Sequence, residues 1–139
     1  MQQLSHKISV KTNGRRLYDI TSQVLTWARS SGFKTGLLTL YVQHTSASIL
    51  INENYDSDVL VDMESFFARL VPDGDRLFIH TSEGPDDMPA HIRSALTQTS
   101  ISIPFLEGKV ALGTWQGIFL YEHRLASHNR NVLLHLIAE

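Results

Sequence analysis

Four predicted strands follow one another in the segment ISIPFLEGKVALGTWQGIFLYEHRLASHNRNVLLHLI, residues 101–137. Each strand is a short run rich in apolar, β-branched and aromatic residues, and the runs cover 101–105, 109–112, 116–122 and 131–137. Turn-forming glycines and a polar stretch at 127–129 separate the runs. Short apolar runs between such breaks are typical of strands. The C-terminal third of the chain is therefore predicted to be all β.

Further strands are predicted nearer the N-terminus. Residues 4–10 alternate between apolar and polar, and Asn13-Gly14 makes a tight turn into 16–18, which together predict a β-hairpin. Additional strands are predicted at 36–42 and 48–51, and in the short apolar run 77–79 that ends at His80.

Three amphipathic segments predict helices at about 21–31, 59–70 and 88–97. Thr21 or Ser22 is expected to cap the first helix, and Asp86 or Asp87 the third. Strands grouped at both ends of the chain, without a regular βαβα alternation, favour an α+β fold in which helices cover one side of largely antiparallel sheets. A length of 139 residues suits one domain, residues 1–139.

Composition excludes several functions. A formal charge of −2 argues against generic binding of nucleic acid or of an anionic membrane surface. The chain has no cysteine, so a transition metal would need histidine and carboxylate ligands. No leader-like start and no apolar run long enough to span a bilayer are present, which makes the cytoplasm the expected compartment.

Three histidines could form a metal site. His44 and His80 each follow a predicted strand, and His91 lies in the first turns of a predicted helix, where a fold brings side chains together. Three imidazoles with one open position are typical of catalytic zinc sites. Their intervals of 36 and 11 residues match no local ligand motif, so ordinary surface or hydrogen-bonded histidines are the competing interpretation.

The other four histidines are weaker candidates. His6 is expected to be exposed on a strand, and His135 half-buried in one. His123 and His128, close to Arg124 and Arg130, could favour an anion or belong to a solvated loop.

Two polar segments also have two interpretations each. Glu53, within Asn52-Glu53-Asn54, could act as a general base or orient a ligand, or the segment could simply cap a helix. The glycines around Trp115 predict a bulge or a close backbone approach, and Trp115 could stack on a planar ligand or lie in the core.

The chain also resembles a known family. The matching segments are His44-Thr45-Ser46-Ala47, Asn52-Glu53-Asn54, the run at 87–92, and LGTWQGI at 112–118 with Tyr121-Glu122-His123-Arg124. Together they resemble the YjbQ family, which is described as a secondary thiamine-phosphate synthase. The resemblance implies a two-sheet β-sandwich with helices packed against it, a homotrimer, and a His44, His80 and His91 pocket near subunit contacts that holds a divalent metal, with zinc as the expected ion.

The same resemblance implies roles for further residues. Glu53, Gln116 and Glu122 are expected to act in catalysis, and the expected ligand-binding residues are Asn52, Trp115, Arg93, Arg124 and Arg130. The implied reaction joins a pyrimidine pyrophosphate to a thiazole phosphate with loss of pyrophosphate, so the substrate would be a phosphorylated heterocycle. The sequence shows no glycine-rich phosphate loop and no Asp/Glu pair for magnesium, which suggests that the synthase activity is secondary.

Three functions therefore remain open. The first is a metal-binding enzyme with weak thiamine-phosphate synthase activity. The second is a metal-dependent hydrolase of a small phosphorylated or acyl substrate, with Glu53 as candidate base. The third is a non-catalytic module that binds an anion between subunits.

Overall fold

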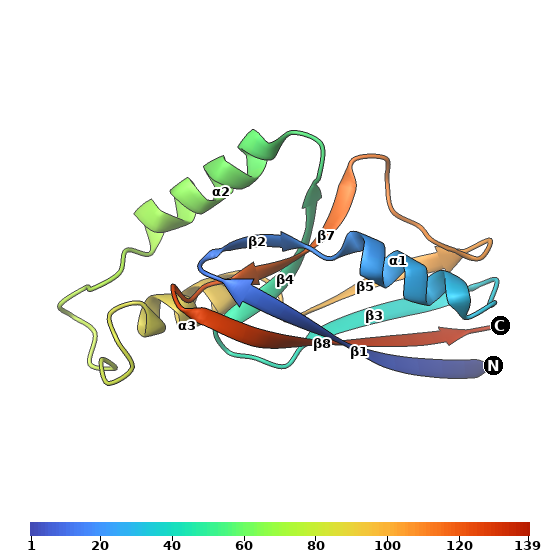
Figure 1. Cartoon of the computed structure of the whole chain (residues 1–139), viewed down its shortest axis with the longest axis horizontal. Coiled ribbons are helices and arrows are strands. Elements are labelled where there is room, and N and C mark those ends of the chain that lie inside the picture. Colours follow the sequence, from blue (N-terminus) through green and yellow to red (C-terminus); the bar gives the residue numbers. More distant parts are fainter.

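Two antiparallel sheets and three helices make up the computed structural model, which describes residues 1–139 (Figure 1). The larger sheet has the strand order β1-β8-β3-β5-β6, and the smaller sheet has the order β2-β7-β4. The strands are β1 Gln2–Asn13, β2 Arg16–Asp19, β3 Gly36–Val42, β4 Ala47–Glu53, β5 Ser100–Leu106, β6 Lys109–Val110, β7 Gln116–Glu122 and β8 Ser127–Ala138. The helices are α1 Thr21–Ser30, α2 Ser57–Leu70 and α3 Asp87–Leu96. The α+β class and the two-sheet arrangement are confirmed.

The main core lies where the inner faces of the two sheets meet α1. Strand alternation buries every second residue of β3 and β8, such as Leu38, Leu40 and Leu134, while their neighbours point outward. Val24 and Ala28 of α1 belong to the same buried cluster. Buried residues recur at every second position in the strands and along one stripe of the helix. Both kinds of element could therefore be predicted from the sequence.

The predicted N-terminal hairpin is wrong. β1 pairs with β8 and β2 pairs with β7, so the two strands belong to different sheets. Gly14, with φ 94°, turns the chain from the larger sheet into the smaller one. Turn-forming residues predict that the chain changes direction. They do not predict which strand each neighbouring strand pairs with, because that depends on where its apolar face is buried.

Two other strand boundaries differ from prediction. β8 begins at Ser127, so the polar stretch at 127–129 is part of a strand, because its backbone pairs with β1 from Asn13 to Lys11. The run 77–79 is not a strand: no neighbouring strand pairs with it, and Leu77 and Ile79 are 87% and 99% exposed.

The helices agree with prediction in place but not in their capping. The cap residue of α1 is Ile20, and Thr21 instead bonds Asp19. Asp86 makes no capping hydrogen bond to α3, because its carboxylate binds Arg124. None of the three helices combines the length and apolar character needed to cross a membrane.

Gly36 is required where β3 passes between its two neighbours. A Cβ built on Gly36 would lie 2.2 Å from the Ile137 carbonyl oxygen and 2.5 Å from the Ala138 Cβ, both in the adjacent strand. We expect Gly36→Ala to lower the free energy of unfolding by about 1–3 kcal/mol, because the backbone must shift to admit the methyl group. Urea unfolding measures this, with Gly113→Ala as the matched control, since its Cβ would meet only the flexible Gln116 side chain. Equal midpoints for the two variants would contradict the prediction.

Candidate metal centre

Four side chains converge at the start of α3. They are His80, Glu83, Asp87 and His91, and one ligand atom from each lies within 4.8 Å of the others. Asp87 and His91 are four residues apart on α3 and so project from the same face of the helix. His80 and Glu83 come from the loop that leads into the helix. Two imidazoles and two carboxylates form a donor set that could hold a metal ion.

The distances within this group are close to those of a coordination sphere. Nε2 of His80 lies 2.6 Å from Asp87 Oδ2, and Nε2 of His91 lies 3.1 Å from the same oxygen. His80 Nε2 lies 3.5 Å from Glu83 Oε2. Ligand atoms around a tetrahedral zinc ion are about 3.3 Å apart, given bond lengths of about 2.0–2.1 Å. A divalent cation could therefore replace the shared protons with only small side-chain movements.

A hydrogen bond orients the His91 ring for such a role. Nδ1 of His91 lies 3.0 Å from the Thr45 carbonyl oxygen, which can only accept, so Nδ1 carries a proton. Nε2 is then the nitrogen that faces the group. A histidine whose distal nitrogen donates to a backbone carbonyl is the usual arrangement for a metal ligand, because it selects the tautomer.

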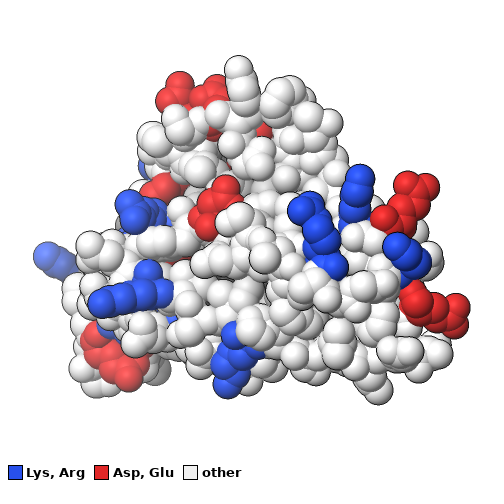
Figure 2. All heavy atoms as spheres, turned by 45° about the vertical axis from the view of Figure 1, so that its right-hand side comes forward, with Lys and Arg blue, Asp and Glu red and all other residues white.

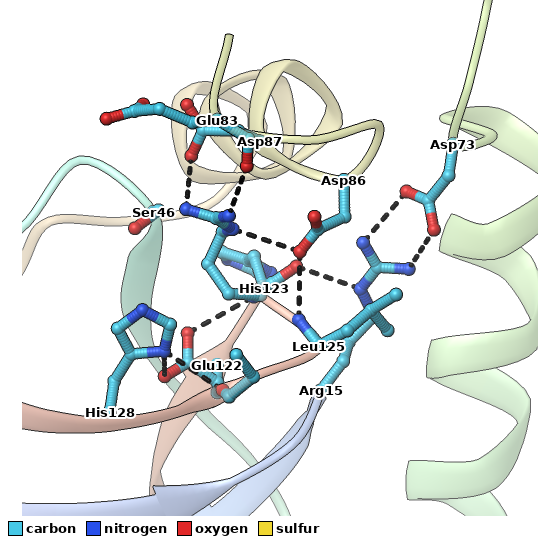
Figure 3. A network of polar contacts seen from close by, with 12 residues as sticks. Arg15, Ser46, Asp73, Glu83, Asp86, Asp87, Glu122, His123, Leu125 and His128 are labelled. Carbon is cyan, nitrogen blue, oxygen red and sulfur yellow. Dashed lines mark hydrogen bonds and ion pairs between the residues drawn. The ribbon is translucent and has the colours of Figure 1, made fainter. Parts of the chain in front are cut away.

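Arg124 holds the other side of Asp87. Its Nη1 donates to Asp87 Oδ1 at 2.7 Å, its Nε donates to Asp86 Oδ2 at 2.9 Å, and its Nη2 donates to the Glu83 carbonyl. Burial alone would raise the pKa of Asp87, but the hydrogen bond from His80 and the charge of Arg124 lower it to about 2. Asp87 is therefore an ionised carboxylate that is fixed from both sides. Figure 3 shows Asp87 and Glu83 at one end of this polar network and Glu122 with His128 at the other.

The group opens toward solvent on the His80 side. The His80 side chain is 40% exposed, and its hydrogen bond to Asp87 raises its pKa. A cavity of about 430 Å³ adjoins it, lined by Asp75, Arg76, Phe78 and His80 together with other loop residues. This volume falls within the range of small-ligand pockets, roughly 300–1,000 Å³.

His44 does not join this group. Its Nε2 accepts a hydrogen bond from the Asn131 backbone N–H at 2.7 Å, and burial followed by the Arg130 charge lowers its pKa. A neutral ring that accepts at Nε2 carries its proton on Nδ1, which leaves no lone pair for a metal. The structure thus unites His80 and His91 but replaces the expected His44 with two carboxylates.

Glu122 and Arg130 form a buried ion pair instead of lining a pocket. Arg130 Nε donates to Glu122 Oε1 at 2.8 Å, Thr12 Oγ1 donates to the same oxygen at 2.6 Å, and Arg130 also donates to Ser46. Burial alone would raise the pKa of Glu122, but the hydrogen bonds from Arg130 and Thr12 hold it below its ordinary value. Every hydrogen bond found for this pair is internal, which points to a structural role.

Arg93 is likewise occupied within the fold. Its side chain is 1% exposed, and Nη1 donates to both Glu64 oxygens, at 2.9 and 3.1 Å. Tyr121 donates to the same carboxylate. Arg93 therefore ties α3 to α2, and a ligand could reach it only if the helices moved apart.

The remaining predicted site residues lie at the other end of the smaller sheet. In the β4–β7 register Glu53 pairs with Gln116, whereas Ala47 pairs with Glu122. Six residues at about 3.3 Å each separate these ends by about 20 Å. The expected catalytic set of Glu53, Gln116 and Glu122 therefore does not meet in one chain.

Asn52 and Trp115 share this distant end. The Asn52 side chain accepts from the Glu53 backbone N–H at 2.8 Å. Trp115 is 55% exposed and tilts against Tyr55 with ring centres 4.7 Å apart, so it is not a core residue. The close approach predicted for the flanking glycines is confirmed at Gly117, where a Cβ would lie 2.8 Å from the Asn54 Cβ.

Two features of the structure were not predicted from the sequence: the Asp87–His91 pair and the buried His123. The Asp87 and His91 spacing on a predicted helix was a usable signal, because i and i+4 side chains share a face. His123 left no such signal. It is fully buried, its Nε2 lies 2.8 Å from Ser48 Oγ, its Nδ1 has no partner, and burial with the Arg93 charge lowers its pKa to about 3.

The fold and this histidine and carboxylate group define an α+β protein with a potential metal centre. The family model described as UPF0047 protein YjbQ-like matches residues 6–139, and the chain belongs to this family. A UPF0047 protein of Synechocystis is 52% identical over 130 residues, covering 94% of this chain and 88% of the relative. The UPF0047 protein YjbQ of Escherichia coli is 44% identical over 133 residues, covering 95% and 94%.

Solved structures show the same fold. The hypothetical protein APE1520 of Aeropyrum pernix matches with a TM-score of 0.89 and 30% identity, covering 98% of this chain and 99% of that one. A protein of Sulfolobus solfataricus, described as YbjQ-like and of unknown function, matches with a TM-score of 0.85 and 26% identity, covering 99% and 100%.

Proposed function

We propose that this protein is a divalent-metal-dependent enzyme that acts on a small phosphorylated substrate, with His80, Glu83, Asp87 and His91 as the metal ligands. The observation that carries the proposal is the convergence of these four ligand atoms, with His91 oriented by Thr45 and Asp87 by Arg124. Zinc is the ion that suits two imidazoles and carboxylates best, given the absence of thiolates.

The adjoining cavity supports a phosphorylated substrate. Arg76 lines it and takes part in no ion pair within the chain, so its guanidinium is free to bind a phosphate. A bound zinc ion would add Lewis acidity toward a phosphoryl oxygen. Arg124 would keep Asp87 ionised and oriented, and the open side of His80 would admit the substrate.

Metal binding can be tested directly by calorimetric titration of tag-free, metal-stripped protein with zinc. We expect one ion per chain, and an affinity at least about 100-fold weaker in Asp87→Asn and His91→Ala, because each removes a ligand from a preformed set. His135→Ala is the control, since His135 bonds only Gln3 on an outer strand face. His44→Ala should also bind zinc normally. Loss of binding in His44→Ala but not in Asp87→Asn would favour the three-histidine site instead.

Within this proposal, thiamine-phosphate synthase is a secondary activity. The resemblance suggests it, and a metal ion beside Arg76 would stabilise a departing pyrophosphate. We expect slow, zinc-dependent formation of thiamine phosphate, lost in Asp87→Asn and kept in Glu53→Gln, because Glu53 lies at the far end of the β4–β7 pair, about 20 Å from Glu122. Chromatographic detection of the product measures this. No product with any divalent metal would remove the synthase reaction while leaving the metal site intact.

The same distance weakens the alternative of a metal-dependent hydrolase that uses Glu53 as its base, because Glu53 cannot reach this centre within one chain.

We further propose that the chain forms a trimer, as the resemblance implies. Phe66 and Leu70, 52% and 53% exposed on α2, are apolar surfaces that an interface could cover. Light scattering on the eluting protein gives its mass.

A further inference from the structure

A second cavity lies between α1 and the segment that joins β6 to β7. Figure 1 shows where these two elements run in the fold. Its volume is about 320 Å³. Arg29 from the last turn of α1 and Lys109 from the start of β6 line it, so residues 80 apart in the sequence bring two positive charges to one hollow. Neither cation takes part in an ion pair within the chain, and none of the ten lining residues is acidic.

This pairing of cations is local. On the face shown in Figure 2, basic and acidic side chains are interspersed, with no continuous basic surface. The chain as a whole carries a formal charge of −2. Two unpaired cations in one cavity therefore indicate a small anion rather than a long polyanion.

The other polar groups of the cavity are suited to the same ligand. The Gln116 Oε1 accepts from the Gly113 backbone N–H at 2.7 Å, which leaves the Gln116 amide N–H groups as the donors that remain. Asn54 and Thr114 add an amide and a hydroxyl to the lining. Two cations with several neutral donors are the chemistry that binds a phosphate group.

An exposed aromatic pair belongs to the two segments whose Asn54 and Thr114 line this cavity. Trp115 follows the lining residue Thr114, and Tyr55 follows the lining residue Asn54. The Asn54 backbone N–H donates to the Trp115 carbonyl at 3.0 Å, which holds the two segments together. The side chains of Trp115 and Tyr55 are 55% and 75% exposed. Exposed apolar surface often marks a ligand or interaction site, and aromatic side chains stack favourably on planar rings.

We propose that this cavity is a second ligand site, which binds the phosphate of an aromatic phosphate monoester on Arg29 and Lys109 and its ring on Trp115 and Tyr55. The site is separate from the metal centre. Gln116 lies at one end of the β4–β7 pair, and Glu122 lies at the other end, about 20 Å away, beside the Arg124 that holds Asp87. The proposed site requires no metal ion and no histidine.

Fluorescence provides a direct test, because the chain has only two tryptophans. In Trp27→Phe protein, emission comes from Trp115 alone. We expect phenyl phosphate to change this emission saturably, with a dissociation constant in the millimolar range or below, in buffer that contains a chelator. Inorganic phosphate should compete for the same site, and more weakly than phenyl phosphate because it lacks the ring.

Variants separate the two halves of the site. Arg29→Gln with Lys109→Gln should weaken phenyl phosphate binding at least about tenfold, because both phosphate contacts lose their charge. Lys7→Gln with Lys11→Gln removes the same charge from two exposed positions on β1 and should leave binding unchanged. Trp115→Ala, followed by calorimetry, should abolish the preference for phenyl phosphate over inorganic phosphate.

Two results would overturn the proposal. One is the absence of saturable binding, and the other is binding that the Arg29 and Lys109 variants do not alter. Asp87→Asn distinguishes this site from the metal centre: it should bind phenyl phosphate normally, and loss of binding there would assign the ligand to the metal centre.

Discussion

Replacing Arg130 with methionine is expected to lower the free energy of unfolding by about 3–5 kcal/mol. Arg130 donates to both Glu122 oxygens, and the Glu122 side chain is completely buried. Without the guanidinium, an ionised carboxylate would remain in the interior with only Thr12 and a backbone N–H as donors. The cost arises from this uncompensated charge. Urea unfolding at pH 7 measures it.

Two further variants make the Arg130 test specific. Asp73→Asn breaks the more exposed Arg15–Asp73 pair and should cost no more than about 1 kcal/mol. Combining Arg130→Met with Glu122→Leu removes both charges together and should recover much of the lost stability, because a buried ion pair contributes little relative to well-packed apolar residues. A cost below about 1 kcal/mol for Arg130→Met alone would show that Glu122 reaches water.

Mild acid should destabilise the protein through His123. The pKa of this buried histidine is lowered to about 3 in the folded protein, whereas an unfolded histidine has its ordinary value of 6.5. Between these values the unfolded chain binds a proton that the folded chain does not. Stability is therefore fully present above pH 6.5 and is lost as the pH falls toward 3. One proton taken up on unfolding corresponds to about 1.4 kcal/mol per pH unit.

A comparison of variants isolates this contribution from other titrating groups. We expect the stability difference between wild type and His123→Gln to narrow as pH falls from 7 to about 4.5, because glutamine cannot take up the proton. His135→Gln, at a half-exposed position, is the matched control. Urea unfolding across this pH range provides the data. A constant difference between wild type and His123→Gln would mean that His123 titrates normally.

The class of fold and most of its elements could be predicted from local patterns. The stripe from Val59 to Leu70 is one face of α2, and the alternation in β3 and β8 matches burial on one side of a sheet. These patterns repeat within a few residues, so they depend only on the geometry of one helix or strand. The pairing of Asp87 with His91 on one face of α3 belongs to the same kind of information.

The candidate site was only partly predictable, because its composition depends on pairings between distant segments. His44 and His91 both looked like ligands, yet the Asn131 N–H occupies His44 Nε2 while Thr45 orients His91 toward Asp87. Asp87, four residues before His91, is a local sign of a ligand, but nothing near His44 in the sequence excludes His44 from the site. The hydrogen-bond partners that decide the two roles lie 87 and 46 residues away.

The sequence by itself therefore determined the helices, most strands and the α+β class, since each follows from hydrophobic periodicity along a short stretch. Only the tertiary structure decided that β1 and β2 belong to different sheets and that Glu53 and Glu122 lie at opposite ends of one strand pair. It also decided that His123 is buried without charge. The physical reason is that the register and burial of a strand depend on which distant strand supplies its hydrogen bonds and its apolar contacts. Local periodicity does not specify that partner.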